Sequence, residues 1–312
     1  MELRQLRYFV RIVDLGSVSK AAADLFIAQP ALSRQVAALE AELNSALLVR
    51  STRGVTPTES GRAFYVQAQA ILRQVGRIPE EVQSAAERPT GTVAVGMPFS
   101  ASCIVAPALV GAVRERLPGV KISVTQGVSD HLEGLLANGR LNLSLLFERE
   151  NPARHIEERH LLVEDLFLVT PRRKGPTGVA RQTITLAEAA RQELILPGPA
   201  NTTRRIVERA FLKAGQPLKL LAEVDAPWTT KSMVSAGLGA AILSRSALYP
   251  ESDSPGLCVQ RISRPSLSRA LNLCTLRSEP LGRAAALVRD ILDQLVRDMV
   301  RDGIWQGAAL GG

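Results

Sequence analysis

The apolar residues of this chain change their spacing at Gly91, and the change separates two kinds of architecture. Before Gly91 they recur every three or four residues, which is the period of an amphipathic helix. After Gly91, short β-rich runs such as residues 92–96 alternate with helical stretches. Strand–helix–strand units of this kind form parallel sheets with right-handed crossovers. The 312 residues therefore predict an α/β protein overall whose amino-terminal part is helical.

The helical part begins with three predicted helices. An apolar stripe predicts the first over residues 3–15, which Gly16 ends, and Ser17 or Ser19 can cap a second over residues 19–25. After a turn at residues 26–28, a third helix begins near Gln29, with Pro30 in its first turn, where the missing N–H costs nothing. Two short helices joined by a tight turn form a helix-turn-helix, here about residues 18–37, whose second helix can enter a major groove.

The polar residues of this segment suit DNA recognition. Glutamine can bond adenine bidentately, arginine can do the same to guanine, and serine can meet a base edge or a phosphate. Short β-prone runs at residues 47–49 and 55–56 predict a hairpin beside the helices, which would make the helix-turn-helix a winged one. The alternative is that these residues only form the solvated face of an amphipathic helix. The candidate DNA contacts are Ser19, Lys20, Gln29, Pro30, Ser33, Arg34, Arg50 and Arg53.

These residues also carry a family resemblance. The register of Leu6-x-x-Phe9, Ala21-Ala22-x-x-Leu25, Gln29-Pro30-Ala31-Leu32-Ser33, Leu39-Glu40-x-x-Leu43 and Thr58-Glu59-x-Gly61 resembles the amino-terminal domain of LysR-type transcriptional regulators. The chain departs from that family at Asn44-Ser45, where a Leu-Gly turn is common. Residues 26–33, 53–59 and 261–268 are similar to the nitrogen assimilation control group, although relatives with these stretches could regulate aromatic or organic-acid pathways instead.

The resemblance implies a winged helix-turn-helix over residues 1–58 and a linker helix for dimerisation over residues 59–88. Pro79 should kink or end that helix near residues 77–78, leaving a second short helix over 80–87. The implied partners are double-stranded promoter DNA, RNA polymerase, a small anionic metabolite and further copies of the chain as a homodimer or homotetramer. The narrow apolar stripe that would pair with a second copy consists of Phe64, Ala68, Ile71, Leu72 and Val75.

For residues 89–312 the resemblance implies a periplasmic-binding-protein-like effector domain with subdomains at about 91–168 plus 270–312 and at 169–269. The predicted strands are 92–96, 120–125, 143–147, 166–169, 194–196, 218–224, 240–243 and 271–274, and the helices are 104–116, 130–138, 186–190, 204–214, 229–236 and 284–300. Ligands of open parallel sheets bind at the carboxyl ends of strands, where hydroxyls and free amides can hold a carboxylate. The same hydroxyls can instead be simple helix caps. The candidate effector contacts are Ser100, Ser102, Phe147, Thr202, Thr203 and Thr229.

Other features limit the remaining function classes. The net charge of +8 suggests nucleic acid, yet residues 1–58 carry only +2 of it. Gly237-Leu238-Gly239 lacks the third glycine of a dinucleotide site, and His155 and His160 have the wrong spacing for a helical metal pair, so we expect no catalytic residues, metal or cofactor. Cys103 lies near a predicted helix start, where a redox-sensitive thiolate is favoured, but no resolving cysteine lies nearby in the sequence.

The charged start and the absence of a long apolar run predict a cytoplasmic chain that does not enter the membrane. The rival interpretation is a cytoplasmic small-molecule-binding α/β protein whose amino-terminal helices are only a dimerisation arm.

Overall fold

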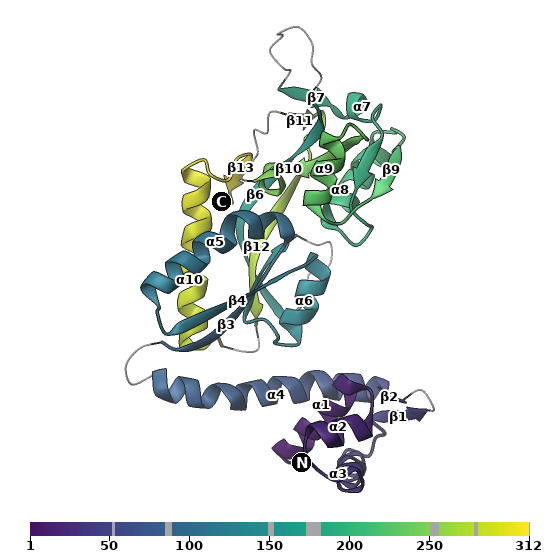
Figure 1. Cartoon of the computed structure of the whole chain (residues 1–312), viewed down its shortest axis with the longest axis vertical. Coiled ribbons are helices and arrows are strands. Elements are labelled where there is room, and N and C mark those ends of the chain that lie inside the picture. The colour runs from purple at the N-terminus through teal and green to yellow at the C-terminus, as the bar shows by residue number, and fades with distance from the viewer. Residues whose placement is uncertain are drawn as a thin grey trace. The chain divides into compact units, whose positions relative to one another are not determined.

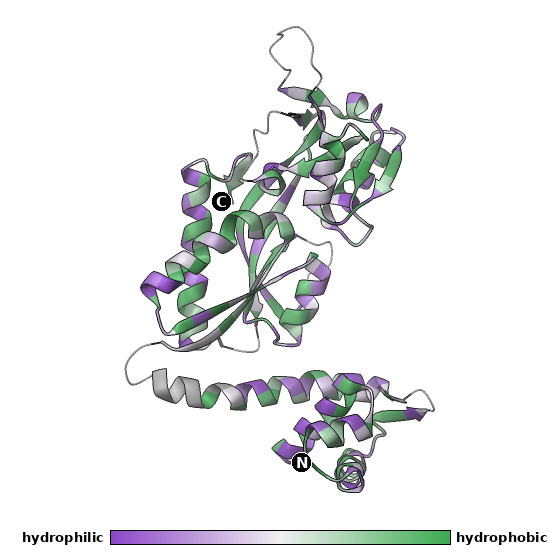
Figure 2. Cartoon of the chain, viewed as in Figure 1, coloured by the Kyte–Doolittle hydropathy of each residue, from purple (hydrophilic) through white to green (hydrophobic). Residues whose placement is uncertain are grey.

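The computed structural model describes residues 1–51, 54–84, 89–148, 153–172, 182–249, 256–277 and 280–311. The chain divides into two compact units (Figure 1). The first comprises Met1–Glu87 with Ala137–Gly139, and the second comprises Arg88–Leu136 and Arg140–Gly312. Figure 2 shows hydrophobic residues concentrated along the central strands of the second unit, whereas its helices carry both hydrophobic and polar residues.

The first unit contains the predicted helix-turn-helix. Helix α1 has the predicted bounds, because Gly16 adopts a left-handed conformation (φ 60°) that ends the helix, and the Ser17 side chain accepts a hydrogen bond from the backbone N–H of Lys20 at the start of the next helix. The buried residues Leu32 and Val36 of the third helix face the core of this unit. The elements are α1 (Leu3–Leu15), α2 (Val18–Asp24), α3 (Gln29–Glu42), β1 (Leu48–Ser51), β2 (Gly54–Pro57) and α4 (Glu59–Ser84).

Side chains from two of the family-like motifs form hydrogen bonds that position the hairpin of this unit. The Glu40 carboxylate accepts hydrogen bonds from the backbone N–H groups of Leu47 (2.8 Å) and Leu48 (3.1 Å). The Thr58 hydroxyl donates to the carbonyl oxygen of Ala46 (2.7 Å) and accepts from the N–H of Gly61 (2.9 Å), which caps α4. These side chains therefore fix the hairpin between α3 and α4.

The departure at Asn44 leaves this geometry intact. Asn44 takes a left-handed conformation (φ 47°), which asparagine tolerates better than most residues with a side chain.

Helix α4 is longer than the sequence predicted. It runs as one helix to Ser84, past Pro79, so the predicted end near residues 77–78 and the separate helix over 80–87 are wrong. A proline removes one backbone hydrogen bond, and a helix of 26 residues retains many others. Residues 85–88 lie outside the described residues.

The second unit has two halves that are joined by two long strands. In the first half β3, β4 and β5 are parallel, and in the second half β8, β9 and β10 are parallel. Strand β12 pairs antiparallel with β5 and β6, and β6 pairs antiparallel with β10, so β6 and β12 cross between the halves. This confirms the predicted α/β class and the two-subdomain architecture of the carboxy-terminal part.

The elements of the first half are β3 (Gly91–Met97), α5 (Phe99–Arg116), β4 (Val120–Gln126), α6 (Ser129–Ala137), β5 (Leu143–Phe147), α10 (Arg283–Arg301) and β13 (Ala308–Leu310). The crossing strands are β6 (Ile156–Pro171) and β12 (Ser268–Leu276). The elements of the second half are β7 (Thr183–Thr185), α7 (Leu186–Ala189), β8 (Leu194–Leu196), α8 (Thr202–Lys213), β9 (Leu220–Glu223), α9 (Pro227–Ser235), β10 (Ala240–Ser244), the short 3₁₀ helix η1 (Arg245–Leu248) and β11 (Leu257–Ser263).

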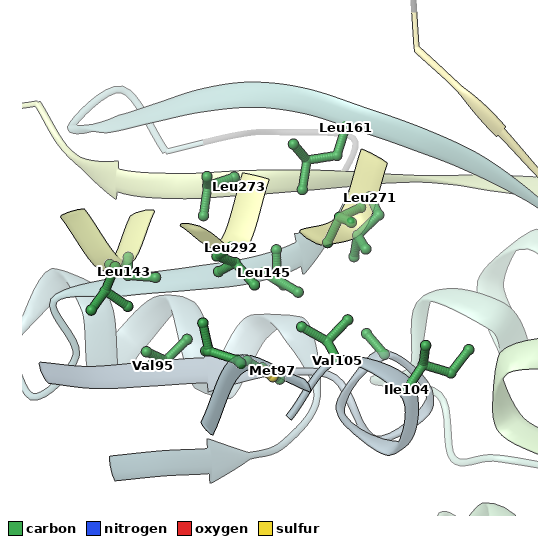
Figure 3. Close-up of a cluster of buried hydrophobic side chains, with 14 of the residues drawn as sticks. Val95, Met97, Ile104, Val105, Leu143, Leu145, Leu161, Leu271, Leu273 and Leu292 are labelled. Atoms are coloured by element: carbon green, nitrogen blue, oxygen red, sulfur yellow. The ribbon is translucent and has the colours of Figure 1, made fainter. Parts of the chain in front are cut away.

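Strands β7, β11 and β13 and the first ten residues of β6 are not predicted by the sequence pattern. Residues 156–165 include five charged side chains, so they lack the apolar run or strict alternation that predicts a strand. They form one because β12 pairs along their whole length. Each half has its own core, and in the first half Val95, Met97, Leu145 and Leu273 pack between the sheet and the helices (Figure 3).

Candidate functional site

The third helix of the first unit presents a polar face. Gln29, Pro30 and Arg34 are exposed and Ser33 is half-buried. The side-chain amide of Gln29 donates to the Ser33 hydroxyl (3.0 Å), so these two groups share one side of α3. The arrangement places an amide, a hydroxyl and a guanidinium near the leading end of the helix, as the sequence suggested.

The other candidate DNA contacts lie on neighbouring elements. Ser19 and Lys20 are exposed on α2, and Arg50 is exposed on β1. Arg53, predicted at the hairpin tip, lies outside the described residues.

One basic residue of this unit, Arg11, forms an ion pair with a neighbouring helix. Arg11 Nε donates to the Asp24 carboxylate (2.6 Å), which links α1 to α2. This hydrogen bond raises the pKa of Arg11 and lowers the pKa of Asp24. The charge of Arg11 is therefore largely matched within the protein.

The dimerisation stripe on α4 is divided between two environments. Phe64 packs edge-on against Phe9 of α1, with ring centroids 5.0 Å apart, and Ala68 is buried. Ile71 is exposed, and Leu72 and Val75 are half-buried. The last three residues keep apolar surface that a second copy could cover.

The second unit contains a cavity of about 60 Å³ between its two halves. Ser100 and Phe147 line it from the first half, and Thr202 and Thr203 line it from the start of α8 in the second. Four of the six candidate effector residues therefore lie together.

Ser102 and Thr229 are not among the described residues that line this cavity. The predicted start of α5 was too late: the helix begins at Phe99, so Ser100 and Ser102 lie inside its first turns rather than before it. The buried Ser102 hydroxyl donates to the Phe99 carbonyl (2.9 Å) and accepts from Gln126 (2.6 Å). Thr229 is exposed, and its neighbour Thr230 is the threonine that reaches the cavity.

Arg269, which the sequence analysis did not identify, lies against this cavity with 8% of its surface exposed. Its Nη2 donates to the Glu164 carboxylate (2.6 Å), and its Nε donates to the same oxygen (2.8 Å). Nη2 also lies within hydrogen-bond distance of the hydroxyls of Ser100 (2.8 Å) and Ser244 (2.9 Å), and Nη1 donates to Thr203 (2.7 Å). Burial lowers the pKa of Arg269, and the charge of Glu164 opposes that effect.

Glu164, on β6, is the counterion and is 1% exposed. Besides Arg269, its carboxylate accepts hydrogen bonds from the Ser246 hydroxyl (2.8 Å) and from Trp305 Nε1 (2.9 Å). Charged residues are almost never fully buried unless they are paired. Glu164 stands between the apolar residues 161–163 and 166–169, and this acidic interruption was the sequence signal that could have indicated a buried partner.

The remaining candidates do not form a further reactive site. Burial raises the pKa of the Cys103 thiol, whose Sγ donates to the Phe99 carbonyl (3.3 Å), which opposes the thiolate that a redox sensor needs. His160 Nδ1 is 3.1 Å from the Asn272 side-chain oxygen. Within the part of the chain that the structure describes, no group of three or more His, Cys, Asp or Glu could hold a metal ion. Among those same residues, no helix combines the length and apolarity that crossing a membrane requires.

Comparisons with known proteins agree with both units. The family described as "Bacterial regulatory helix-turn-helix protein, lysR family" matches residues 3–62, and the "LysR substrate binding domain" matches residues 86–297. The chain is 37% identical over 303 residues to the nitrogen assimilation regulatory protein nac of Klebsiella aerogenes, with 95% of each chain covered. It is 34% identical to the protein of that name from Escherichia coli (strain K12), with 97% of each covered. A full-length OxyR variant from Pseudomonas aeruginosa has a similar fold, with a TM-score of 0.73 at 24% identity over 95% of this chain and 98% of that one.

These matches favour the regulator over the rival interpretation, because the amino-terminal helices match a DNA-binding motif rather than a plain dimerisation arm. The similar full-length relatives are transcriptional regulators and not enzymes. This chain belongs to the LysR family of bacterial transcriptional regulators.

Proposed function

We propose that this regulator recognises promoter DNA through α3 and controls genes of nitrogen metabolism. The observation that carries the DNA assignment is the exposed face of α3, where Gln29 and Ser33 are hydrogen-bonded neighbours and Arg34 is exposed. Gln29 would read adenine, Arg34 would read guanine, and Pro30 would contact the groove wall. Ser19, Lys20, Arg50 and Arg53 would hold phosphates. The pathway rests on the two nitrogen assimilation regulatory relatives.

The protein acts in the cytoplasm as a homodimer or homotetramer, paired through α4 with Ile71, Leu72 and Val75 at the contact. A dimer would set two copies of α3 in successive major grooves of an interrupted palindrome. In this assignment residues 1–58 bind DNA, residues 59–88 mediate dimerisation, and residues 89–312 form the regulatory domain.

The proposed effector site is the cavity between the halves of the second unit, where Ser100, Phe147, Thr202 and Thr203 meet. A volume of about 60 Å³ admits only a small metabolite, since drug-sized ligands occupy pockets of roughly 300 Å³ or more. An effector there would lie beside Arg269.

The test of DNA recognition starts from duplexes that the full-length protein selects from a random pool. Arg34→Ala should weaken binding to the selected duplex by about 1–3 kcal/mol, roughly ten- to a hundred-fold, and relax specificity at one base pair. Arg116→Ala, which removes the same charge from an exposed position of α5, is the matched control and should bind normally. Equal binding by the Arg34→Ala protein would refute the assignment of this residue.

The test of the pathway is chromatin capture of the regulator from cells grown with scarce or ample nitrogen. Enrichment at promoters of nitrogen-uptake and nitrogen-assimilation genes, with their transcription changed in a deletion strain, is the expected result. Enrichment confined to promoters of aromatic or organic-acid catabolism would contradict it.

A further inference from the structure

The guanidinium of Arg269 contacts both halves of the second unit at once. Ser100, on α5 of the first half, accepts from it at 2.8 Å. Thr203, on α8 of the second half, accepts at 2.7 Å, and Ser244, on β10 of the same half, lies at 2.9 Å. Arg269 itself lies on the crossing strand β12, and its counterion Glu164 lies on the crossing strand β6. One planar cation therefore connects four segments that only the tertiary fold brings together.

The surroundings of this cation are those of a bound ligand. Its central carbon lies 3.5 Å from the centroid of the Phe147 ring, in cation–π contact. A buried carboxylate, an aromatic face and a set of hydroxyl acceptors are the groups that recognise the planar, five-donor guanidinium. Ser100, Phe147 and Thr203 were all expected to bind an effector, and in the structure all three contact Arg269.

The counterion is held independently of Arg269. Glu164 also accepts from Ser246 and from Trp305, which are both buried, and these bonds fix the carboxylate where the guanidinium meets it. Removing the arginine side chain would leave a shaped, negatively charged site rather than a collapsed core. Because the pair is neutral overall, the site does not attract a free anion as an unpaired arginine would.

We propose that the centre of the regulatory domain is a guanidinium-binding site whose ligand is the chain's own Arg269, and that this tethered ligand holds the two halves of the domain together. What binds at the centre of this domain does not depend on which DNA the protein recognises. A buried ion pair that contributes only to stability is the competing explanation, since such pairs can be replaced at little cost.

Chemical rescue separates the two explanations. Arg269→Ala should lower the melting temperature of the full-length protein, and N-ethylguanidinium at low millimolar concentration should raise it again saturably, because a ligand that binds only the folded state stabilises it. Ethylammonium, which lacks the planar fork, should not rescue. The matched variant is Arg204→Ala. Arg204 is similarly buried, but its hydrogen bonds to described residues all stay within the second half, to Glu208, Glu223 and the Pro197 carbonyl. Rescue of neither protein, or equal rescue of both, would overturn the proposal.

A second measurement covers the case in which Arg269→Ala does not fold. Arg269→Lys keeps the charge but cannot bridge Ser100, Thr203 and Glu164 together. Hydrogen exchange should then quicken at the starts of α5 and α8 by a similar factor, since the proposed ligand joins both. Faster exchange at one of these starts alone would show that Arg269 does not couple the halves.

The last experiment measures thermal unfolding in the presence of small carboxylates. The probes are acetate, malonate and glutamate. None of these carboxylates should raise the melting temperature of the wild-type protein saturably and fail to do so for the Arg269→Lys protein. A carboxylate that stabilises the wild type but not the Arg269→Lys protein would make Arg269 an anion-binding residue and refute its role as an internal ligand. Failure of DNA binding by the wild type would refute the proposed function and leave this result unaffected.

Discussion

The indole Nε1 of Trp305 donates to the Glu164 carboxylate at 2.9 Å, across 141 residues of chain. Both side chains are 1% exposed, so the bond forms away from water. Trp305 follows α10, and the carboxylate that it holds is the counterion of Arg269. The segment around Trp305 is therefore part of the polar centre of the second unit.

Trp305→Phe should destabilise the protein by at least about 1–3 kcal/mol, because it removes one hydrogen bond to a buried charge and the smaller phenyl ring leaves a cavity where the buried indole was. Urea unfolding followed by far-ultraviolet circular dichroism measures the loss. Trp228→Phe is the control: Trp228 is 64% exposed, and its change should stay within about 0.5 kcal/mol. Equal effects of the two substitutions would show that the Trp305 hydrogen bond contributes nothing.

Two glycines of α4 should respond to alanine with opposite signs. A Cβ on Gly61 would lie 1.9 Å from the Leu47 carbonyl oxygen, so Gly61→Ala must push the hairpin away and should cost about 1–3 kcal/mol. Gly76 has nothing described within 4 Å of its added Cβ, and Gly76→Ala should stabilise the helix by about 0.5–1 kcal/mol. Thermal unfolding of the two variants checks the pair, and destabilisation by both would contradict it.

Phe26 has an unfavourable conformation in the free protein. It is 94% exposed and left-handed (φ 55°) in the turn between α2 and α3. Phe26→Gly should raise stability by up to about 1 kcal/mol, because glycine has no Cβ penalty there. Asn44→Gly, at the other left-handed non-glycine position described in this unit, should gain less stability because asparagine already tolerates this conformation. Calorimetry of both variants tests the order, and a loss of stability in Phe26→Gly would show that the side chain makes a stabilising contact.

The Arg11–Asp24 pair gives the first unit a pH dependence. The hydrogen bond from Arg11 lowers the pKa of Asp24, so the folded state favours the charged carboxylate. The stabilisation is present above the unfolded pKa of about 3.9 and is lost as the pH falls through the lower folded value. Asp24→Asn should therefore be slightly less stable than the wild type at pH 7, and the difference should vanish near pH 2.

Thermal unfolding of both proteins from pH 2 to 7 measures this difference. High salt should reduce it at pH 7, because both side chains are partly exposed. A difference that stays constant across the pH range would mean that the ion pair is not its source.

The helix-turn-helix could be predicted closely because its signals are local. The stripe of Leu6, Phe9 and Val13, the stop at Gly16 and the start at Gln29-Pro30 each act within one or two helical turns. The same holds for the short apolar strands β5 and β8, whose runs are bounded by turn residues. At Pro79 the local rule gave the wrong result, because the rest of a long helix outweighs one missing hydrogen bond.

The sequence by itself determined the family, the helix-turn-helix and the two α/β halves, since periodicity and motif register are properties of neighbouring residues. Only the tertiary structure decided what fills the centre of the second unit. Arg269 and Glu164 are 105 residues apart, and neither has a local pattern that names its partner. They meet because β6 and β12 pair side by side, and a charge leaves water only where such pairing supplies its counterion and its hydrogen bonds.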